Sequence, residues 1–157
     1  MPSVQRASVI DADFETVWNF YDDVDELRRL TPGWLDLEIP RVVGPDGELD
    51  PDRYAVGTEI HLQSRLLDLF AGGEWVVEIT EREVAGGRAQ FVDEQVGDRG
   101  PFESWRHRHR FVDLDGETLL HDRVTYRLPV GGDLPLATPG LALMFWHRHR
   151  RTRQLLE

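Results

Sequence analysis

Hydrophobic and polar side chains alternate along much of this chain, most clearly in segment 104–114. In extended backbone, the odd-numbered residues from Trp105 to Phe111 share one face, and the three arginines between them share the other. Guanidinium groups are stable in water or beside acids, so we expect the arginine face to be the outer one. The aromatic and imidazole side chains of the opposite face predict a strand that lines a cavity.

The same period of two predicts further strands. They cover 35–39, 58–67, 74–84, 88–96 and 117–128, after a first β-prone segment at 4–10. The pairs Gly86-Gly87 and Asp115-Gly116 separate consecutive strands and are typical of hairpin turns. We therefore predict an antiparallel sheet in which consecutive strands are neighbours.

Apolar residues at helical spacing predict a helix near the N-terminus, over 14–21. The carboxylates of Asp11 and Asp13 precede it and can cap its first turn. A second, short helix is expected at 24–30, because the sequence Thr31-Pro32-Gly33 would end it.

The segment 141–156 predicts a terminal helix that is apolar in its first turns and basic in its later ones. Cations near the last carbonyl groups of a helix interact favourably with its dipole. Contact with an anionic lipid head group at a membrane surface, or with an acidic partner, is an alternative role for them. We expect His147 and His149 of this helix to lie at the surface.

Three connections, 44–57, 97–102 and 129–140, are expected to be surface loops that give access to the cavity. The element order is a strand, one or two short helices, about six antiparallel strands and a closing helix. The terminal helix is the one long element left to cover the apolar face of the sheet. We therefore predict an α+β fold in which a curved antiparallel sheet of six or seven strands wraps around a long C-terminal helix.

The length of 157 residues predicts a single domain, 1–157, with one substantial core. The chain has 29 acidic and 18 basic residues, for a net charge of −11, and every basic residue is arginine. An acidic, lysine-free composition fits a halophilic source, in which a carboxylate-rich surface stays hydrated. The negative charge argues against a nucleic-acid partner.

The chain contains no cysteine, which excludes disulfides, thiolate metal sites and a cysteine nucleophile. Its N-terminus does not resemble a secretory signal, and no stretch is long and apolar enough for a transmembrane segment. We therefore expect a cytoplasmic protein that is a monomer or a homodimer.

Several short motifs are spread over the whole chain. They are Phe14 to Tyr21, Asp93-Glu94-Gln95, Gly100-Pro101-Phe102, Trp105, His107, His109, Phe111, Asp122, Tyr126, Pro129, Phe145 and Arg148-His149. As a set they resemble the START and polyketide cyclase/dehydrase superfamily, also called SRPBCC, and in particular its stand-alone ligand-binding members. The resemblance implies the helix-grip fold and a deep, largely apolar cavity suited to lipids, isoprenoids, polyketides or hormones. It implies no particular reaction, because one fold can host carriers, sensors and enzymes.

The predicted inner faces combine apolar and polar side chains. The candidate acid/base residues are Asp93, His107, His109 and Asp122. The candidate ligand contacts are Trp75, Phe91, Gln95, Trp105, Phe111, Tyr126 and Phe145. An imidazole oriented by a carboxylate can act as a general base, but buried polar groups also pair with one another for purely structural reasons. The same groups can instead orient one polar group of a bound ligand.

Histidines at i and i+2 on a strand, with one carboxylate, can also bind a metal ion. The spacing fixes no further ligand, so we expect no metal and no other cofactor. His61 and His121 are expected on outer faces, away from the cavity.

The favoured function is binding or transport of a hydrophobic small molecule in the cavity. An enzyme of the cyclase or dehydratase kind is the alternative, with His107 or His109 as base and Asp93 or Asp122 orienting it. A third possibility is an interaction module whose cavity is filled by its own side chains. A cavity below about 300 Å³ would weaken both small-molecule hypotheses.

Overall fold

The computed structural model describes residues 1–64 and 73–157. Its strands form one seven-stranded antiparallel sheet in the order β1-β7-β6-β5-β4-β3-β2. The strands are β1 (Ser3–Ile10), β2 (Leu37–Val43), β3 (Glu59–Ser64), β4 (Glu74–Ala85), β5 (Arg88–Gln95), β6 (Ser104–Asp113) and β7 (Thr118–Arg127). The helices are α1 (Phe14–Asp22), α2 (Glu26–Leu30), the 3-10 helix η1 (Gly33–Leu35) and α4 (Thr138–Leu156).

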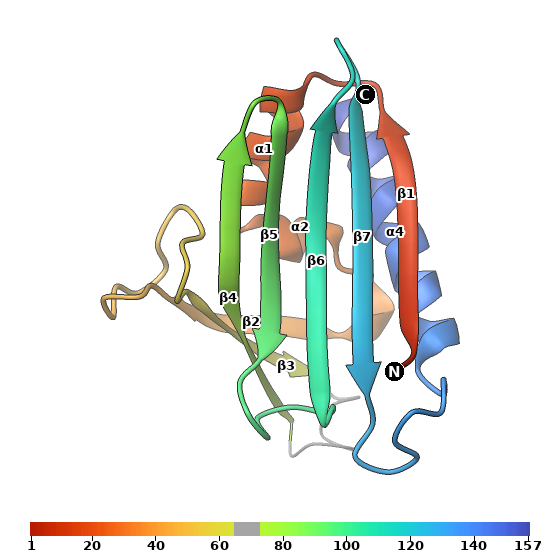
Figure 1. The fold of residues 1–157 in the computed structure, drawn as a ribbon. Coiled ribbons are helices and arrows are strands. Elements are labelled where there is room, and N and C mark those ends of the chain that lie inside the picture. Colours follow the sequence, from red (N-terminus) through yellow and green to blue (C-terminus); the bar gives the residue numbers. More distant parts are fainter. Residues whose placement is uncertain (65–72) are drawn as a thin grey trace.

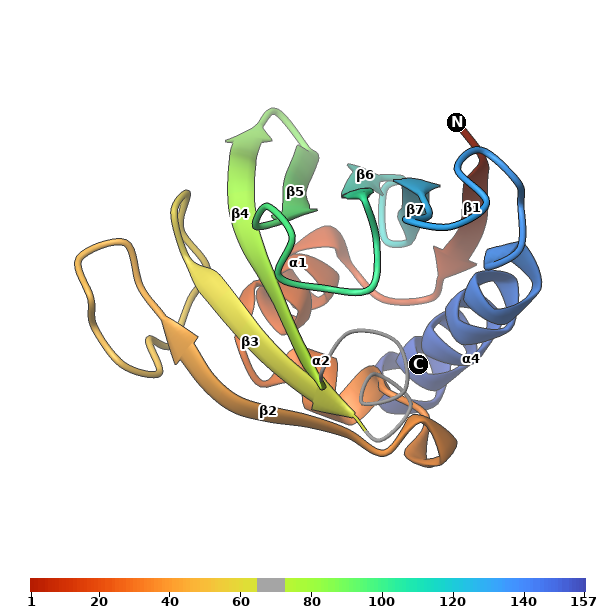
Figure 2. The same cartoon turned by 90° about the horizontal axis from the view of Figure 1, so that it is seen from below.

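The sheet curves around the helices. In Figure 1, α4 lies behind β7 and β1, and α1 and α2 lie behind the middle of the sheet. Figure 2 shows the strands forming an arc from β1 to β2, with α1, α2 and α4 on its inner side. The predicted helix-grip arrangement is therefore confirmed, including the short helices after β1 and the long C-terminal helix.

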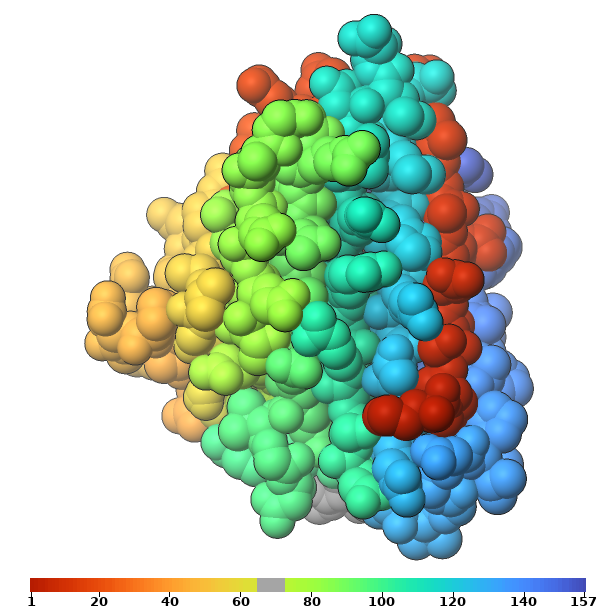
Figure 3. Space-filling model, in the orientation of Figure 1, coloured from red at the N-terminus to blue at the C-terminus, as the bar shows by residue number. Residues whose placement is uncertain are grey.

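The alternation in β6 places its side chains as the sequence predicts. The odd-numbered residues from Trp105 to Phe111 are buried, whereas Arg106 and Arg110 are exposed. Figure 3 shows the outer face of the sheet, on which β4 to β7 and β1 lie side by side. Arg106 binds Glu81 and Glu94 there, each at 3.3 Å.

The core joins α1 to the sheet and to α4. Asp13 caps α1 by accepting a hydrogen bond from the Thr16 amide at 2.8 Å. Trp18 and Tyr21 of this helix are buried, and the centre of the Tyr21 ring lies 5.0 Å from that of Phe111. The Tyr21 hydroxyl bonds the Thr152 hydroxyl at 2.7 Å, which ties α1 to the closing helix.

The inner face of α4 differs from the prediction. His149, which was expected at the surface, is only 1% exposed, and the neighbouring Arg148 is only 3% exposed. They lie three and four residues after the buried Phe145, so helical geometry turns them toward the sheet. The later residues Arg150 and Arg151 are exposed, as expected.

Several boundaries and side-chain positions also differ. The predicted strand 58–67 extends beyond the described residues, and α4 begins three residues earlier than expected. Tyr54 is buried from within the loop 44–57, with its ring 5.7 Å from Phe91. His61 lies on the outer face of β3, as expected. It is nevertheless buried, 3.6 Å from the Glu74 carboxylate.

Across the described residues, no helix combines the length and apolarity needed to cross a membrane.

Candidate functional site

A pocket of about 80 Å³ lies between the inner face of the sheet, α2 and α4. Its walls are largely apolar and aromatic. They include Leu27, Leu35, Leu37, Tyr54, Ile60, Leu62, Trp75, Val77, Phe91, Trp105 and Met144. Five acidic or basic side chains also line the pocket, namely Glu26, Asp93, His107, His109 and Arg148. All five are buried, so the pocket has apolar walls and a buried, charged region, which we call the polar end.

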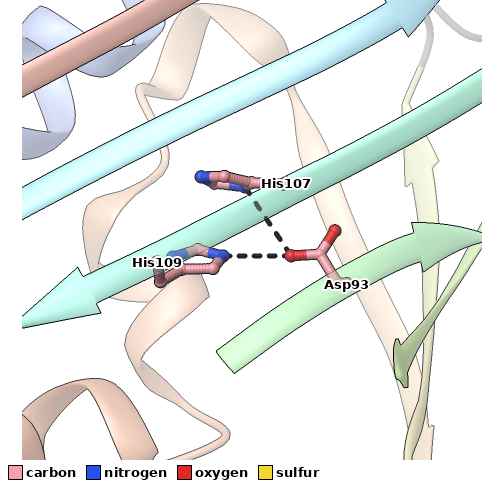
Figure 4. Close-up of side chains that lie close together, drawn as sticks. All are labelled: Asp93, His107 and His109. Carbon is pink, nitrogen blue, oxygen red and sulfur yellow. Dashed lines mark hydrogen bonds and ion pairs between the residues drawn. The ribbon is translucent and has the colours of Figure 1, made fainter. Parts of the chain in front are cut away.

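Asp93 on β5 lies opposite His107 on β6 and faces both histidines of that strand (Figure 4). Its Oδ2 is 3.0 Å from His109 Nε2 and 3.6 Å from His107 Nδ1. The other oxygen, Oδ1, accepts a hydrogen bond from Trp105 Nε1 at 3.0 Å. Antiparallel pairing of β5 and β6 therefore assembles this group from the alternating residues of two strands.

Asp122 on β7 holds the histidines from the other side and is fully buried. Its Oδ1 bonds His107 Nε2 at 2.8 Å, and its Oδ2 bonds His149 Nε2 of α4 at 2.7 Å. His109 Nδ1 lies 3.1 Å from Asp122 Oδ1 but lacks hydrogen-bond geometry. The Ser8 hydroxyl bonds His149 Nδ1 at 2.8 Å, so the network extends to β1.

The two histidines of β6 differ in proton affinity. Burial, together with the charge of His109, lowers the pKa of His107. Burial also acts to lower the pKa of His109, but the close contacts and charges of Asp122 and Asp93 outweigh it and raise the pKa to about 9. At neutral pH, His107 is therefore the neutral imidazole and His109 the cation.

The carboxylates respond to the same contacts in the opposite sense. Burial favours the neutral acid, yet the hydrogen bonds from His107 and His149 and the close contact with the charged His109 hold the pKa of Asp122 well below its usual value. The pKa of Asp93 is likewise lowered against burial, mainly by the hydrogen bond from His109. The structure thus brings the four predicted acid/base residues into one charged network.

Glu26 and Arg148 form a second buried pair at the polar end, between α2 and α4. The Arg148 Nη2 lies 3.5 Å from Glu26 Oε2, which is an ion-pair distance without a hydrogen bond. Burial raises the pKa of Glu26 to about 7, although the charge of Arg148 opposes the shift.

The predicted ligand contacts divide into two groups. Trp75, Phe91 and Trp105 line the pocket. Gln95 instead bonds the backbone of Gly97 and Phe102, and the Tyr126 hydroxyl bonds Thr138 at 2.8 Å. The remaining two, Phe111 and Phe145, are fully buried in the core outside the pocket lining.

Within residues 1–64 and 73–157, Asp93, His107 and His109 form the one group that could hold a metal ion. One ligand atom from each lies within 4.8 Å of the others, as a single divalent cation requires. At neutral pH a metal ion would have to displace the proton that lies between His109 and Asp93. The expectation of no metal therefore stays a prediction, with a physical reason in its favour.

Sequence and fold both match one family. The family described as polyketide cyclase / dehydrase and lipid transport matches residues 10–143. The chain belongs to this family. Membership suggests a hydrophobic ligand without specifying which one. No protein with a curated description matches the chain significantly.

Solved structures share the fold of this family member. The nucleoside-diphosphate sugar epimerase of Corynebacterium glutamicum superposes with a TM-score of 0.65 and 24% identity, over 96% of this chain but only 28% of the epimerase. A START superfamily protein of Mycobacterium smegmatis superposes with a TM-score of 0.65 and 16% identity, over 98% of this chain and 96% of that protein. Norcoclaurine synthase from Thalictrum flavum, in complex with dopamine and hydroxybenzaldehyde, superposes with a TM-score of 0.62 and 13% identity. The match covers 98% of this chain and 85% of the synthase.

Besides much of the aliphatic lining, the sequence analysis of this polyketide cyclase / dehydrase and lipid transport family member missed four titratable residues around the site. Glu26, Tyr54 and Arg148 line the pocket, and His149 supports Asp122. The helical spacing of Arg148 and His149 from Phe145 was the signal that could have identified two of them. Neither Glu26 nor Tyr54 has such a signal, because each reaches the pocket from a short helix or a loop.

Proposed function

We propose that this protein binds a hydrophobic small molecule, such as a lipid, quinone or polyketide-like compound, and carries or sequesters it. The observation that supports the proposal is the division of the pocket into apolar walls and a buried polar end. Ligand sites commonly hold an apolar body in this way and orient it with few polar groups.

The size of the pocket restricts how such a ligand enters. Its volume of about 80 Å³ is smaller than the roughly 300 Å³ of a typical ligand site, which counts against both small-molecule hypotheses for a rigid pocket. Glu26, Leu27 and Leu35 line it from α2 and η1 rather than from the sheet. An outward shift of segment 26–35 would enlarge the pocket without breaking strand pairing, so we expect binding to require this shift.

Native mass spectrometry of protein purified from its own host tests the proposal. We expect a noncovalent adduct that organic extraction removes. Leu62→Phe, which fills the pocket, should abolish the adduct, whereas Leu49→Phe at an exposed position should retain it. Recovery of the bare chain alone under gentle conditions, or an adduct that Leu62→Phe leaves unchanged, would contradict binding in this pocket.

The orientation of His107 favours an enzymatic alternative. Its Nε2 is held by Asp122, which leaves Nδ1 toward Asp93 and the pocket, and its lowered pKa favours the neutral base. In a cyclase or dehydratase-type reaction, Nδ1 would remove a proton from carbon next to a carbonyl group, and Asp122 would orient the ring.

Deuterium exchange tests this alternative without knowledge of the substrate. In D₂O, NMR should show faster exchange of the α-hydrogens of 4-oxopentanoate with the protein than with buffer. His107→Gln should abolish the acceleration, and His121→Gln on the outer face should retain it. Equal exchange with wild type and His107→Gln would exclude His107 as the base.

A further inference from the structure

Arg148 presents an unused pair of donors at the polar end of the pocket. Among the described residues, neither its Nε nor its Nη2 has a hydrogen-bond acceptor, although both atoms are buried. These two nitrogens lie on one edge of the guanidinium group and can bind both oxygens of a carboxylate side-on.

The same protein uses this edge of a guanidinium elsewhere. Arg82 donates from Nε to Asp22 Oδ1 at 3.3 Å and from Nη2 to Asp22 Oδ2 at 2.9 Å. Arg148 has Glu26 as its neighbour, but Glu26 Oε2 lies 3.5 Å from Nη2 and is also without a hydrogen bond within the described part of the chain. The ion pair therefore leaves both Nε and Nη2 of Arg148 without a hydrogen bond.

The other carboxylates near the pocket are already engaged. Asp93 accepts from Trp105 with one oxygen and from His109 with the other. Asp122 accepts from His107 and His149. An acceptor for Arg148 is therefore most simply supplied by a molecule in the pocket, since unpaired buried donors are unfavourable.

We propose that Arg148 binds the carboxylate group of a hydrophobic ligand side-on, with the apolar part of the ligand along the pocket walls. This inference rests on the proposed function and specifies its ligand class as hydrophobic carboxylates. Leu27, Leu62 and Met144 belong to the same pocket lining as Arg148, so an alkyl or aryl group attached to the carboxylate has apolar surface to contact.

Matched titrations with hexanoate and hexan-1-ol test the inference, because the two probes differ in the head group alone. Trp75 and Trp105 line the pocket, so tryptophan fluorescence reports binding. Wild-type protein should bind hexanoate about tenfold more tightly than hexanol, as expected for a charge-assisted bidentate contact. The preference should fall below about threefold in Arg148→Lys, which keeps the charge but loses the planar edge.

Two further variants control the test. Arg151→Met, on the exposed side of α4, should keep the wild-type preference. Glu26→Gln removes the neighbouring carboxylate and should tighten hexanoate binding, which gives a readout even if Arg148→Lys does not fold.

The two proposals fail in different ways. Equal binding of hexanoate and hexanol by wild type would overturn the carboxylate inference and leave binding in the pocket intact. An unchanged preference in folded Arg148→Lys, or no tightening in Glu26→Gln, would also overturn it. Absence of binding for acids and alcohols from four to ten carbons would count against the proposed pocket itself.

Discussion

Asp122 and His149 join the last strand of the sheet to the closing helix through a buried hydrogen bond of 2.7 Å between Oδ2 and Nε2. The other oxygen of Asp122 holds His107, which lines the pocket. One carboxylate therefore fixes the position of α4 and the orientation of a pocket imidazole. Structural support and the candidate site share this residue.

Asp122→Asn should lower the free energy of unfolding by about 3 to 5 kcal/mol, because it removes the charge that compensates buried histidines. Urea denaturation at pH 7 measures the change. Asp46→Asn, in an exposed loop, should stay within about 0.5 kcal/mol of wild type. Equal stability of the two variants would mean that the network contributes little to folding.

Glu26→Gln should change how stability depends on pH. The folded-state pKa of about 7 lies above the usual 4.5, so the folded protein binds the proton more tightly than the unfolded chain. The contribution of Glu26 to stability is complete below pH 4.5 and is lost as pH rises through 7. Relative to Glu26→Gln, wild type should therefore lose up to about 3 kcal/mol between pH 4.5 and 7.5.

Urea denaturation at several pH values across this range measures the difference for Glu26. Glu48→Gln at an exposed loop position is the control and should show no such trend. A difference between wild type and Glu26→Gln that stays constant with pH would contradict the raised pKa.

Gly100→Ala should destabilise the protein, because a methyl group there would overlap the Gln95 side chain and the Trp75 ring. Overpacking of this kind typically costs about 1 to 3 kcal/mol. Thermal unfolding measures the loss, and near-ultraviolet circular dichroism should report a changed Trp75 environment. Gly140→Ala in α4 meets nothing within 4 Å and should be neutral or slightly stabilising. A Gly100→Ala variant as stable as wild type would show that the loop can shift.

Phe111→Leu should separate core packing from ligand contact. Phe111 is fully buried against Trp18 and Tyr21 and does not line the pocket, so the variant should lose about 1 kcal/mol or more with hexanoate affinity unchanged. Phe91→Leu, in the pocket wall, should change the affinity. If Phe111→Leu weakened hexanoate binding and Phe91→Leu did not, Phe111 would be a ligand contact, as the sequence predicts.

The sequence by itself determined the faces of the strands and the order of the elements. In β6, the strict alternation from Trp105 to Phe111 leaves one arrangement in which the aromatic residues are buried and Arg106 and Arg110 reach water. Helical spacing of apolar residues identified α1, and the pairs Gly86-Gly87 and Asp115-Gly116 identified two hairpin turns. These features depend on near neighbours in the chain, so a single sequence reveals them.

Tertiary structure alone decided which charges meet. Asp93 and His109 come from adjacent strands, Asp122 and His149 from a strand and a helix, and Glu26 and Arg148 from two helices. Such pairs depend on strand register and on the rotation of α4, which no local pattern encodes. A polar or charged side chain is stable in the interior only beside its partner, so the sequence predicts His149 at the surface, and only the fold shows that Asp122 is there to pair with it.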